Sequence, residues 1–307
     1  MESIANISVV IPSYNRSEIL LDTLDQLFNQ TIKPNEVLVI DQTLYDQGDA
    51  AAESLRKLDE VGDIRWLRLN EPSIPAAMNK GLLESVSESV LFLDDDIQVS
   101  SDFLAKHQQV IDQFKPLAHV GQVVQPWQKP NQVFEHQMDD QKITLNADLE
   151  FMFNAAEPAS IQNCMAGNLC VDRKSALAVG GFDENFSGVA YRFESEFCKR
   201  FCKALDTRFL YSPLPSLNHL YIKSGGTRTH ANYLISSKPV HSFGDYYFAL
   251  LFGEGGSKYK YIVSRLFLSV CAKFYVRRPW YIPLRLAGEV RGLFKALECV
   301  KQGQKLL

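Results

Sequence analysis

The segment Val90–Ile97 constrains the fold most strongly, because a strand pattern runs directly into three adjacent carboxylates. Residues 90–93 are apolar, as in a strand buried within a sheet. Asp94, Asp95 and Asp96 follow at once, and their like charges repel one another unless something positive lies against them. A divalent cation, which prefers oxygen ligands, would supply that charge. A solvated acidic turn that caps the next helix is the alternative interpretation.

The first hundred residues alternate between strand and helix patterns. Apolar runs predict strands at residues 7–11, 36–41, 64–69 and 90–93, and helical spacing predicts helices at 18–29, 50–58 and 75–86. This alternation is typical of a parallel sheet covered by helices on both faces, in which ligands bind beyond the carboxyl ends of the strands. Pro12–Arg16, Asp41 and Asp94–Asp96 all stand at such ends.

These strand ends offer side chains that suit a nucleotide. Tyr14 could lie against the base, Asp41 could accept a base N–H, and the Asp cluster could hold ribose and metal. The structural alternatives are a core ring for Tyr14, a turn residue for Asp41 and a solvated helix start for Arg16. The sequence contains neither a Gly-x-Gly-x-x-Gly turn nor a P-loop, so a metal ion and side chains would hold the diphosphate. A nucleotidyltransferase is disfavoured, because Pro12–Arg16 lacks the glycine-rich loop with a lysine that it would need.

Seven short motifs follow one another along roughly three quarters of the chain. They are Ile7–Arg16, Val39–Asp41, Asn79–Gly81, Leu93–Asp96, Gly167–Asn168, Gly180–Glu184 and Phe193–Glu196. This ordered series resembles the inverting family-2 glycosyltransferases of GT-A type. The resemblance implies an α/β fold with a GT-A-like, Rossmann-type, mostly parallel sheet and flanking helices.

The resemblance also implies a nucleotide-binding wall. The family's base pocket maps onto Pro12, Tyr14 and Asp41. Its Asp-x-Asp signature maps onto Asp94, as a ribose contact, and Asp96, as a ligand of the Mg²⁺ or Mn²⁺ ion that bridges the two phosphates. Such an ion takes one or two carboxylates with substrate phosphates and offsets charge on the departing diphosphate.

Further contacts are expected around the metal and the diphosphate. His219 stands where many relatives carry a histidine near the metal, although a lone histidine is often structural. Asp95 is grouped with the nucleotide-binding residues without a role of its own. Many members have an arginine where this chain has Met78, so Arg16 or Lys80 would replace it. Arg228 is expected to grip the diphosphate oxygens once substrate is bound.

The general base is expected at the start of a helix near residues 192–205. The family motif Glu-Asp-x-Glu-Leu aligns with Phe193–Phe197, which puts Glu194 at the base position and a phenylalanine where an acid normally stands. Asp183 and Glu196 are alternative bases. A single carboxylate suffices for inversion, because one base on the side opposite the departing nucleotide takes the proton. The structural alternative is that a helix dipole favours an acid in its first turn.

The acceptor is expected to meet the segment that follows an apolar strand at residues 119–124. From there to about Ile161 the sequence is polar and weakly periodic, as in specificity loops. Trp127 is a candidate ring for stacking on a sugar, with a core tryptophan as the alternative. Asp183 is the second candidate acceptor contact.

Charge is divided unevenly along the chain. Residues 257–307 hold eleven Lys and Arg against two Glu, whereas residues 1–256 hold 21 basic against 34 acidic residues. Helical patterns from about residue 243 mix apolar and basic residues, and the longest apolar stretch, residues 266–272, is far shorter than the ~20 residues of a membrane span. Basic amphipathic helices suit a bilayer surface. Packing on the catalytic domain or in a homodimer is the competing interpretation.

Composition excludes several classes of protein. With 46% hydrophobic and 22% charged residues, the chain fits neither a disordered nor a fibrous class. Six cysteines without a Cys-x-x-Cys pair argue against structural zinc and favour reduced thiols. No segment resembles a signal peptide. We therefore expect a cytoplasmic protein, peripheral at the inner face of the membrane.

The sequence thus predicts a nucleotide-sugar-binding half at residues 1–115, an acceptor-binding and catalytic half at 116–235, and a basic helical region at 236–307. We expect a metal-dependent inverting glycosyltransferase that moves a sugar from a UDP- or dTDP-sugar to a glycan or glycolipid hydroxyl, for example in cell-surface polysaccharide synthesis. No nucleic-acid partner is expected. The altered base motif and the missing arginine favour the alternative, an inactive nucleotide-sugar-binding or scaffolding protein.

Overall fold

A computed structural model of the chain describes residues 4–134, 145, 151–222, 224–226 and 234–307. Arg228, the predicted diphosphate contact, lies outside the described residues. The structural statements below concern the described residues.

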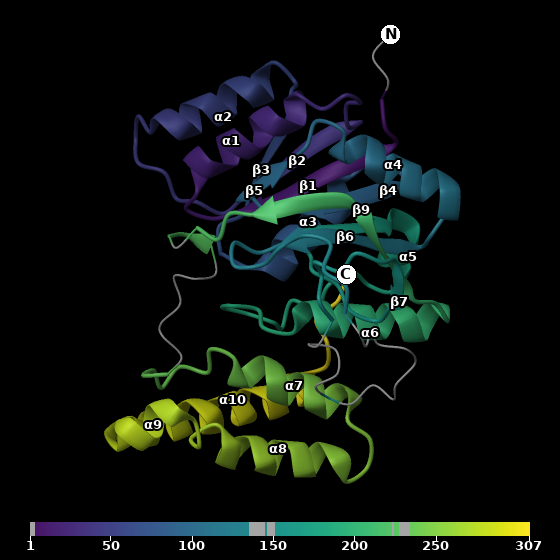
Figure 1. Cartoon of the computed structure of the whole chain (residues 1–307). Helices are drawn as coiled ribbons and strands as arrows, with labels where there is room; N and C mark the ends of the chain where they lie inside the picture. The colour runs from purple at the N-terminus through teal and green to yellow at the C-terminus, as the bar shows by residue number, and fades with distance from the viewer. Residues whose placement is uncertain (1–3, 135–144, 146–150, 223, 227–233) are drawn as a thin grey trace.

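Nine strands of this part of the chain form one sheet between layers of helices (Figure 1). They are β1 (Ile7–Ser13), β2 (Glu36–Asp41), β3 (Arg65–Arg68), β4 (Ser89–Leu93), β5 (Ile97–Val99), β6 (Ala118–Val124), β7 (Ala159–Ile161), β8 (Asn168–Asp172) and β9 (Phe209–His219). Their order across the sheet is β3-β2-β1-β4-β8-β6-β9-β5, and β7 pairs with β9.

β3, β2, β1 and β4 pair in parallel with one another, and β6 pairs in parallel with β9. β8 runs antiparallel to both β4 and β6, and β5 and β7 run antiparallel to β9. The prediction of an α/β sheet with flanking helices is confirmed, and the sheet is more mixed than the β-α alternation of the first hundred residues indicated. The short strands β5 and β7 were not predicted, because three residues carry too little hydrophobic pattern.

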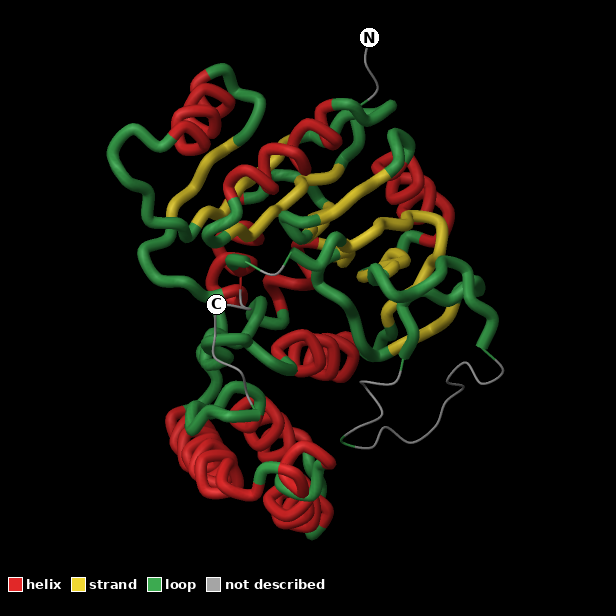
Figure 2. Tube along the Cα trace, turned by 60° about the vertical axis from the view of Figure 1, so that its left-hand side comes forward, coloured by secondary structure: helices red, strands yellow, loops and turns green. Residues whose placement is uncertain are grey.

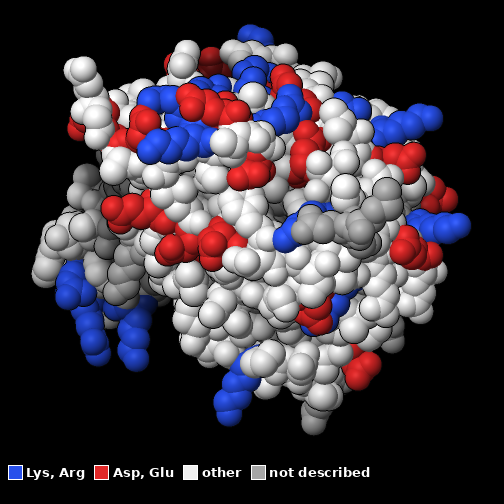
Figure 3. Space-filling view, turned by 90° about the horizontal axis from the view of Figure 1, so that it is seen from above, with Lys and Arg blue, Asp and Glu red and all other residues white. Residues whose placement is uncertain are grey.

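Helices cover both faces of the sheet (Figures 1 and 2). One face carries α1 (Ser17–Phe28), α2 (Ala50–Glu60) and α4 (Phe103–Phe114), and the other carries α3 (Ile74–Glu84), α5 (Arg173–Ala178) and α6 (Phe193–Leu205). The strands bury alternate residues toward the two layers: Val9 joins the core under α1 and α4, whereas Val10 joins the core over α3 and α6. Acidic and basic side chains are both spread over the surface seen from above (Figure 3).

A further group of helices lies beyond α6, on the side away from the sheet (Figure 1). It comprises α7 (Ser242–Phe252), α8 (Ser257–Leu268), α9 (Lys273–Arg277), η3 (Pro279–Tyr281) and α10 (Ile282–Gln302), and is called the helical region below. No helix of the described chain combines the length and the apolar character that crossing a bilayer requires.

The residues after α10 return to the sheet domain, as the position of the C-terminus in Figure 1 shows. Leu307 N–H donates to Gly180 O at 2.9 Å, and Lys305 Nζ lies 2.7 Å from Glu184 Oε2. Asp183 accepts hydrogen bonds from the Lys305 backbone at 3.0 Å and from Tyr247 Oη at 2.8 Å. This segment therefore ties the helical region to the loop before α6.

Candidate functional site

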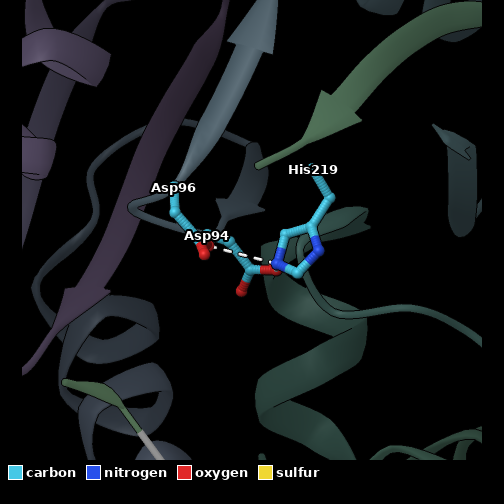
Figure 4. Close-up of side chains that lie close together, drawn as sticks. All are labelled: Asp94, Asp96 and His219. Carbon is cyan, nitrogen blue, oxygen red and sulfur yellow. Dashed lines mark ion pairs between the residues drawn. The ribbon is translucent and has the colours of Figure 1, made fainter. Parts of the chain in front are cut away.

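Asp94, Asp96 and His219 meet where β4 and β9 end (Figure 4). The antiparallel pairing of β5 with β9 sets Ile97 opposite His219 and so brings the histidine beside the Asp cluster. His219 Nε2 lies 3.1 Å from Asp96 Oδ1 and 3.8 Å from Asp94 Oδ2. One potential ligand atom from each of the three lies within 4.8 Å of the others.

This donor set fits a divalent cation. Two carboxylate oxygens and an imidazole nitrogen are ligands that Mn²⁺ accepts, and Mg²⁺ favours the oxygens. His219 Nδ1 lies 2.9 Å from Gln125 Oε1, and an N–H donated there would let Nε2 act as the ligand when a metal ion is bound. Gln125 was not predicted. The parallel pairing of β6 with β9 explains its position. Val124 pairs with Asn218, so the residues that follow them, Gln125 and His219, also lie side by side.

The three aspartates occupy different environments. Arg16 Nη1 lies 3.0 Å from Asp95 Oδ1 and 3.2 Å from Asp96 Oδ2. Burial raises the pKa of Asp95 to about 6, although Arg16 and the Ser13 hydroxyl lower it. Burial also acts to raise the pKa of Asp96, but the hydrogen bond and charge of His219, with Arg16, hold that pKa below its ordinary value. The side chain of Asp94 is half-exposed.

Arg16 and Asp95 therefore form a buried charge pair as well as lining the site. Arg16 Nε donates to Ser224 O at 2.8 Å, and its Nη2 donates to Ile222 O at 2.9 Å, so the guanidinium joins the Asp cluster to the chain after β9. Lys80, the alternative replacement for the missing arginine, does not line the cavity described next, whereas Arg16 does.

A cavity of about 510 Å³ opens in front of the cluster. Its lining includes the segment Pro12–Tyr14 with Gln42, from the ends of β1 and β2, and Gly188, Val189 and Glu194, from the start of α6 and the loop before it. Pro12 and Tyr14 therefore stand where the sequence placed them, at the cavity, while Gln42 and the 188–189 loop were not predicted.

Trp127 also lines the cavity. Its side chain is 66% exposed and meets the Tyr221 ring edge-to-face at 5.0 Å. This exposure excludes the core tryptophan that was the alternative interpretation. Met78, which stands where many family members have an arginine, is buried and lines the cavity.

Glu194 lies in the first turn of α6 and faces the same cavity as the Asp cluster. Burial, reinforced by the charge of Asp94, raises its pKa to about 7, against the hydrogen bond from Ala166 N–H. That bond is 2.6 Å long. A Cβ at the next residue, Gly167, would lie 2.2 Å from Asp94 Oδ2, so a side chain there would displace the Asp94 carboxylate. The turn at 166–167 therefore touches both the base candidate and the Asp cluster.

Asp183 and Glu196 are not brought to the cavity among the described residues. Both are fully buried. Glu196 pairs with Arg200 at 2.7 Å and accepts a hydrogen bond from Gln304, and Asp183 holds the C-terminal segment described above. Asp183 stays a prediction as an acceptor contact or base, and in this structure its oxygens bind Tyr247 of α7 and residues 304–305.

The role of Asp41 as a base contact stays a prediction. Asp41 is fully buried and is absent from the described cavity lining, although its neighbour Gln42 is part of it. Its Oδ2 accepts hydrogen bonds from Tyr45 Oη, Trp66 Nε1 and Arg68 Nη1, and its Oδ1 accepts one from Thr43 N–H. In this structure Asp41 therefore ties together the ends of β2 and β3.

Curated proteins share short segments with this chain. Poly(ribitol-phosphate) beta-N-acetylglucosaminyltransferase TarP of Staphylococcus aureus is 32% identical over 92 residues, which are 29% of this chain and 28% of that protein. GalNAc(5)-diNAcBac-PP-undecaprenol beta-1,3-glucosyltransferase of Campylobacter jejuni is 32% identical over 101 residues, 32% of each chain. The chain thus matches about a third of the length of these relatives.

Solved structures share the fold over most of the chain. Staphylococcus aureus TarS 1-349 in complex with UDP-GlcNAc aligns with 99% of this chain and 93% of its own, at a TM-score of 0.55 and 15% identity. Mannosyltransferase PcManGT from Pyrobaculum calidifontis, in complex with GDP-Man and Mn²⁺, aligns with 97% and 79%, at a TM-score of 0.53 and 16% identity. The GT-A-like fold predicted from the sequence is confirmed.

The family model described as glycosyl transferase family 2 matches residues 8–179. This range covers β1 to α5 and contains the Asp cluster, the 166–167 turn and more than half of the chain. The chain therefore belongs to glycosyl transferase family 2.

Proposed function

We propose that the protein transfers a sugar from a nucleoside diphosphate sugar to a hydroxyl group of a glycan or glycolipid, with inversion at the anomeric carbon. The observation that carries the proposal is one cavity faced by a metal-binding set, Asp94, Asp96 and His219, and by a separate carboxylate of raised pKa, Glu194. Two relatives are named for poly(ribitol-phosphate) and for a glycan on PP-undecaprenol, which supports a polymeric or lipid-linked acceptor.

The donor would lie along the Pro12–Tyr14 side of the cavity. Tyr14 and Gln42 would contact the base, and Asp94, whose carboxylate is half-exposed, would contact the ribose. Asp96 and His219 would hold Mg²⁺ or Mn²⁺, which when bound offsets charge on the departing diphosphate. We propose a UDP- or dTDP-sugar; a UDP-sugar occupies TarS, one of the proteins that share the fold.

Glu194 would act as general base. In the transfer step the acceptor oxygen forms a bond to the anomeric carbon, the bond from that carbon to the diphosphate oxygen breaks, and the acceptor's hydroxyl proton passes to the Glu194 carboxylate. A pKa of about 7 suits this task, because the group is substantially ionised at neutral pH and is still a strong enough base. Trp127, exposed at the cavity, would stack on the acceptor sugar.

A donor screen tests this function. Wild-type protein is incubated with UDP-, dTDP- and GDP-sugars, with Mn²⁺ or with a chelator, and release of nucleoside diphosphate and thermal stabilisation are both measured. We expect turnover of at least one donor that the chelator abolishes, and a matching rise in melting temperature, because a ligand of the folded state stabilises it. Stabilisation by nucleotide and metal without turnover of any donor, with glycan acceptors present, would support the inactive binding protein instead.

We also propose that α8 lies against an anionic membrane surface. Three large residues four positions apart, Tyr259, Val263 and Phe267, project from it and are each more than half exposed. The helix carries Lys258 and Lys260 and no acidic residue, while its third basic residue, Arg265, pairs inward with Asp245. It lies at the edge of the molecule away from the sheet (Figure 1). An apolar stripe with basic neighbours fits the interface of a bilayer containing anionic lipid.

Vesicle flotation tests the membrane surface. Wild type should float with phosphatidylcholine vesicles that contain phosphatidylglycerol and not with phosphatidylcholine alone, and Val263→Ser/Phe267→Ser should remain behind. Phe114→Ser, which changes an exposed apolar residue of α4, is the matched control and should float. If the wild type binds neither kind of vesicle and sediments as a dimer, the apolar stripe of α8 would instead be a contact with a second copy of the chain.

A further inference from the structure

The loop before α6 adopts an unfavourable backbone conformation next to the cavity. Gly188, Ala190 and Arg192 have φ angles of +70°, +50° and +70°. The left-handed region favours glycine, so its use by an alanine and an arginine persists only where surrounding structure imposes it. Gly188 and Val189 line the cavity, and Arg192 is the N-cap residue of α6, two positions before Glu194. The conformation of this loop therefore sets the direction from which Glu194 enters the site.

Helix α7 supplies the structure that imposes this conformation. Arg192 Nε lies 2.5 Å from Asp245 Oδ1, and both side chains are almost fully buried. The preceding residue of α7, Gly244, lies against the Tyr191 carbonyl so closely that a Cβ would stand 1.9 Å from its oxygen. Two consecutive residues of α7 thus contact two consecutive residues of the loop.

The contact continues into the rest of the helical region. Asp245 Oδ2 also pairs with Arg265 of α8 at 2.6 Å, and Arg265 lies 3.3 Å from Glu289 of α10. Loss of one member of a buried ion pair leaves its partner uncompensated, so Asp245 cannot be removed without disturbing Arg192. Ion pairs from α7, α8 and α10 are therefore linked, through Asp245, to the N-cap residue of α6, Arg192.

We infer that α7 positions the cavity-lining loop 188–192, with Asp245 and Gly244 as positioning residues that act on Glu194 through Arg192. The inference rests on the proposed role of Glu194. It assigns the helical region a part in building the acceptor side of the active site, in addition to any contact with a membrane.

Amide hydrogen exchange of the full-length protein tests the inference without requiring turnover. In Asp245→Asn, exchange within residues 187–196 should rise about tenfold or more, whereas residues 90–98, around the Asp cluster, should exchange as in wild type. Glu289→Gln is the matched control, because it removes another buried carboxylate of the same network without touching the loop. It should lower the melting temperature and leave exchange at 187–196 unchanged. If Asp245→Asn does not fold, Arg192→Gln can be measured in its place, because it removes the other member of the ion pair. Exchange within residues 187–196 should then rise in the same way.

The kinetic readout separates positioning from general destabilisation. With a donor that the wild type uses, Asp245→Asn should lower kcat by about tenfold to a hundredfold and leave KM for the donor within about twofold, since a displaced base slows chemistry but not donor binding. Glu289→Gln should keep kcat near wild type. Wild-type exchange at 187–196 in a folded Asp245→Asn protein, or equal effects of the two variants, would overturn the inference. A protein that turns over no donor would fail the proposed function, and the exchange result would still decide whether α7 holds the loop.

Discussion

The two walls of the cavity are built in different ways. The donor wall follows the ends of β1, β4 and β9, where strand pairing and the Arg16–Asp95 pair hold Asp96 and His219. The acceptor wall consists of the 166–167 turn, the 188–192 loop and the first turn of α6, held by backbone contacts and by the helical region. A strand end is fixed by its own sheet, whereas a loop depends on distant parts of the chain. Mutations in the two walls should therefore differ in what they change.

Asp96→Asn should have the largest effect on the donor wall. It removes a buried charge from the proposed metal set, and loss of several kcal/mol of stabilisation of the departing diphosphate corresponds to a fall of about 10³-fold in kcat/KM. Stabilisation by UDP with Mn²⁺ should be lost as well, as measured by thermal shift. Gln98→Asn, an exposed change two residues away, is the control. Full activity of Asp96→Asn would contradict the proposed metal site at Asp94, Asp96 and His219.

Gly167→Ala should affect both walls at once. A Cβ at this position collides with Asp94 Oδ2, and the adjacent Ala166 N–H bonds Glu194. We expect kcat/KM to fall about a hundredfold, because a displacement of about 1 Å at a reacting group costs that much. Gly256→Ala is a control for glycine replacement on the surface, since its φ is −73° and nothing lies within 4 Å of a Cβ there. A Gly167→Ala variant with unchanged turnover would mean that the two walls are not joined through this turn.

The pH profile should report the acceptor wall. Burial raises the pKa of Glu194 to about 7 from an ordinary 4.5, and the ionised form is the base. The rate should therefore rise with pH, by about tenfold per unit below pH 7, and level off above it. The same shift means that ionisation of Glu194 opposes folding, so the protein loses stability as pH rises from about 4.5 to about 7. A rate that is flat between pH 5 and pH 8 would exclude Glu194 as the titrating base.

Asp41→Asn should change stability more than activity. The buried carboxylate receives four hydrogen bonds, one of them from the Arg68 guanidinium. The variant should lose about 1–3 kcal/mol of unfolding free energy in urea. Affinity for UDP with Mn²⁺ should stay within a few-fold, because Asp41 does not line the described cavity. A tenfold loss of nucleotide affinity at unchanged stability would support the base contact that the family resemblance implies.

The sequence predicted the donor wall better than the acceptor wall for physical reasons. Apolar runs and helical spacing located β1, β2 and β4, and their common direction placed Tyr14 and Asp96 at one edge of the sheet. The pattern could not show where each side chain points. Asp41 stands at a strand end as predicted, yet it faces Trp66 and Arg68 of β3.

Long-range partners account for the rest. The different environments of the three aspartates depend on Arg16, about eighty positions earlier in the chain. They also depend on the pairing of β9 with β5, a strand of three residues. Ala190 and Arg192 are not residue types that favour turns, so the sequence gives no sign of their positive φ angles. The burial of Asp183 follows from residues 303–307, whose sequence gives no sign that they return to the sheet domain.

The most direct test of the division between a donor wall and a base wall is Glu194→Gln, measured for both binding and turnover. We expect a folded protein that still gains stability from UDP with Mn²⁺, and whose sugar transfer falls by about 10²- to 10⁴-fold. The variant should also be more stable than wild type at pH 8, because the ionised carboxylate is gone. Transfer at the wild-type rate, or loss of nucleotide binding together with turnover, would contradict that division.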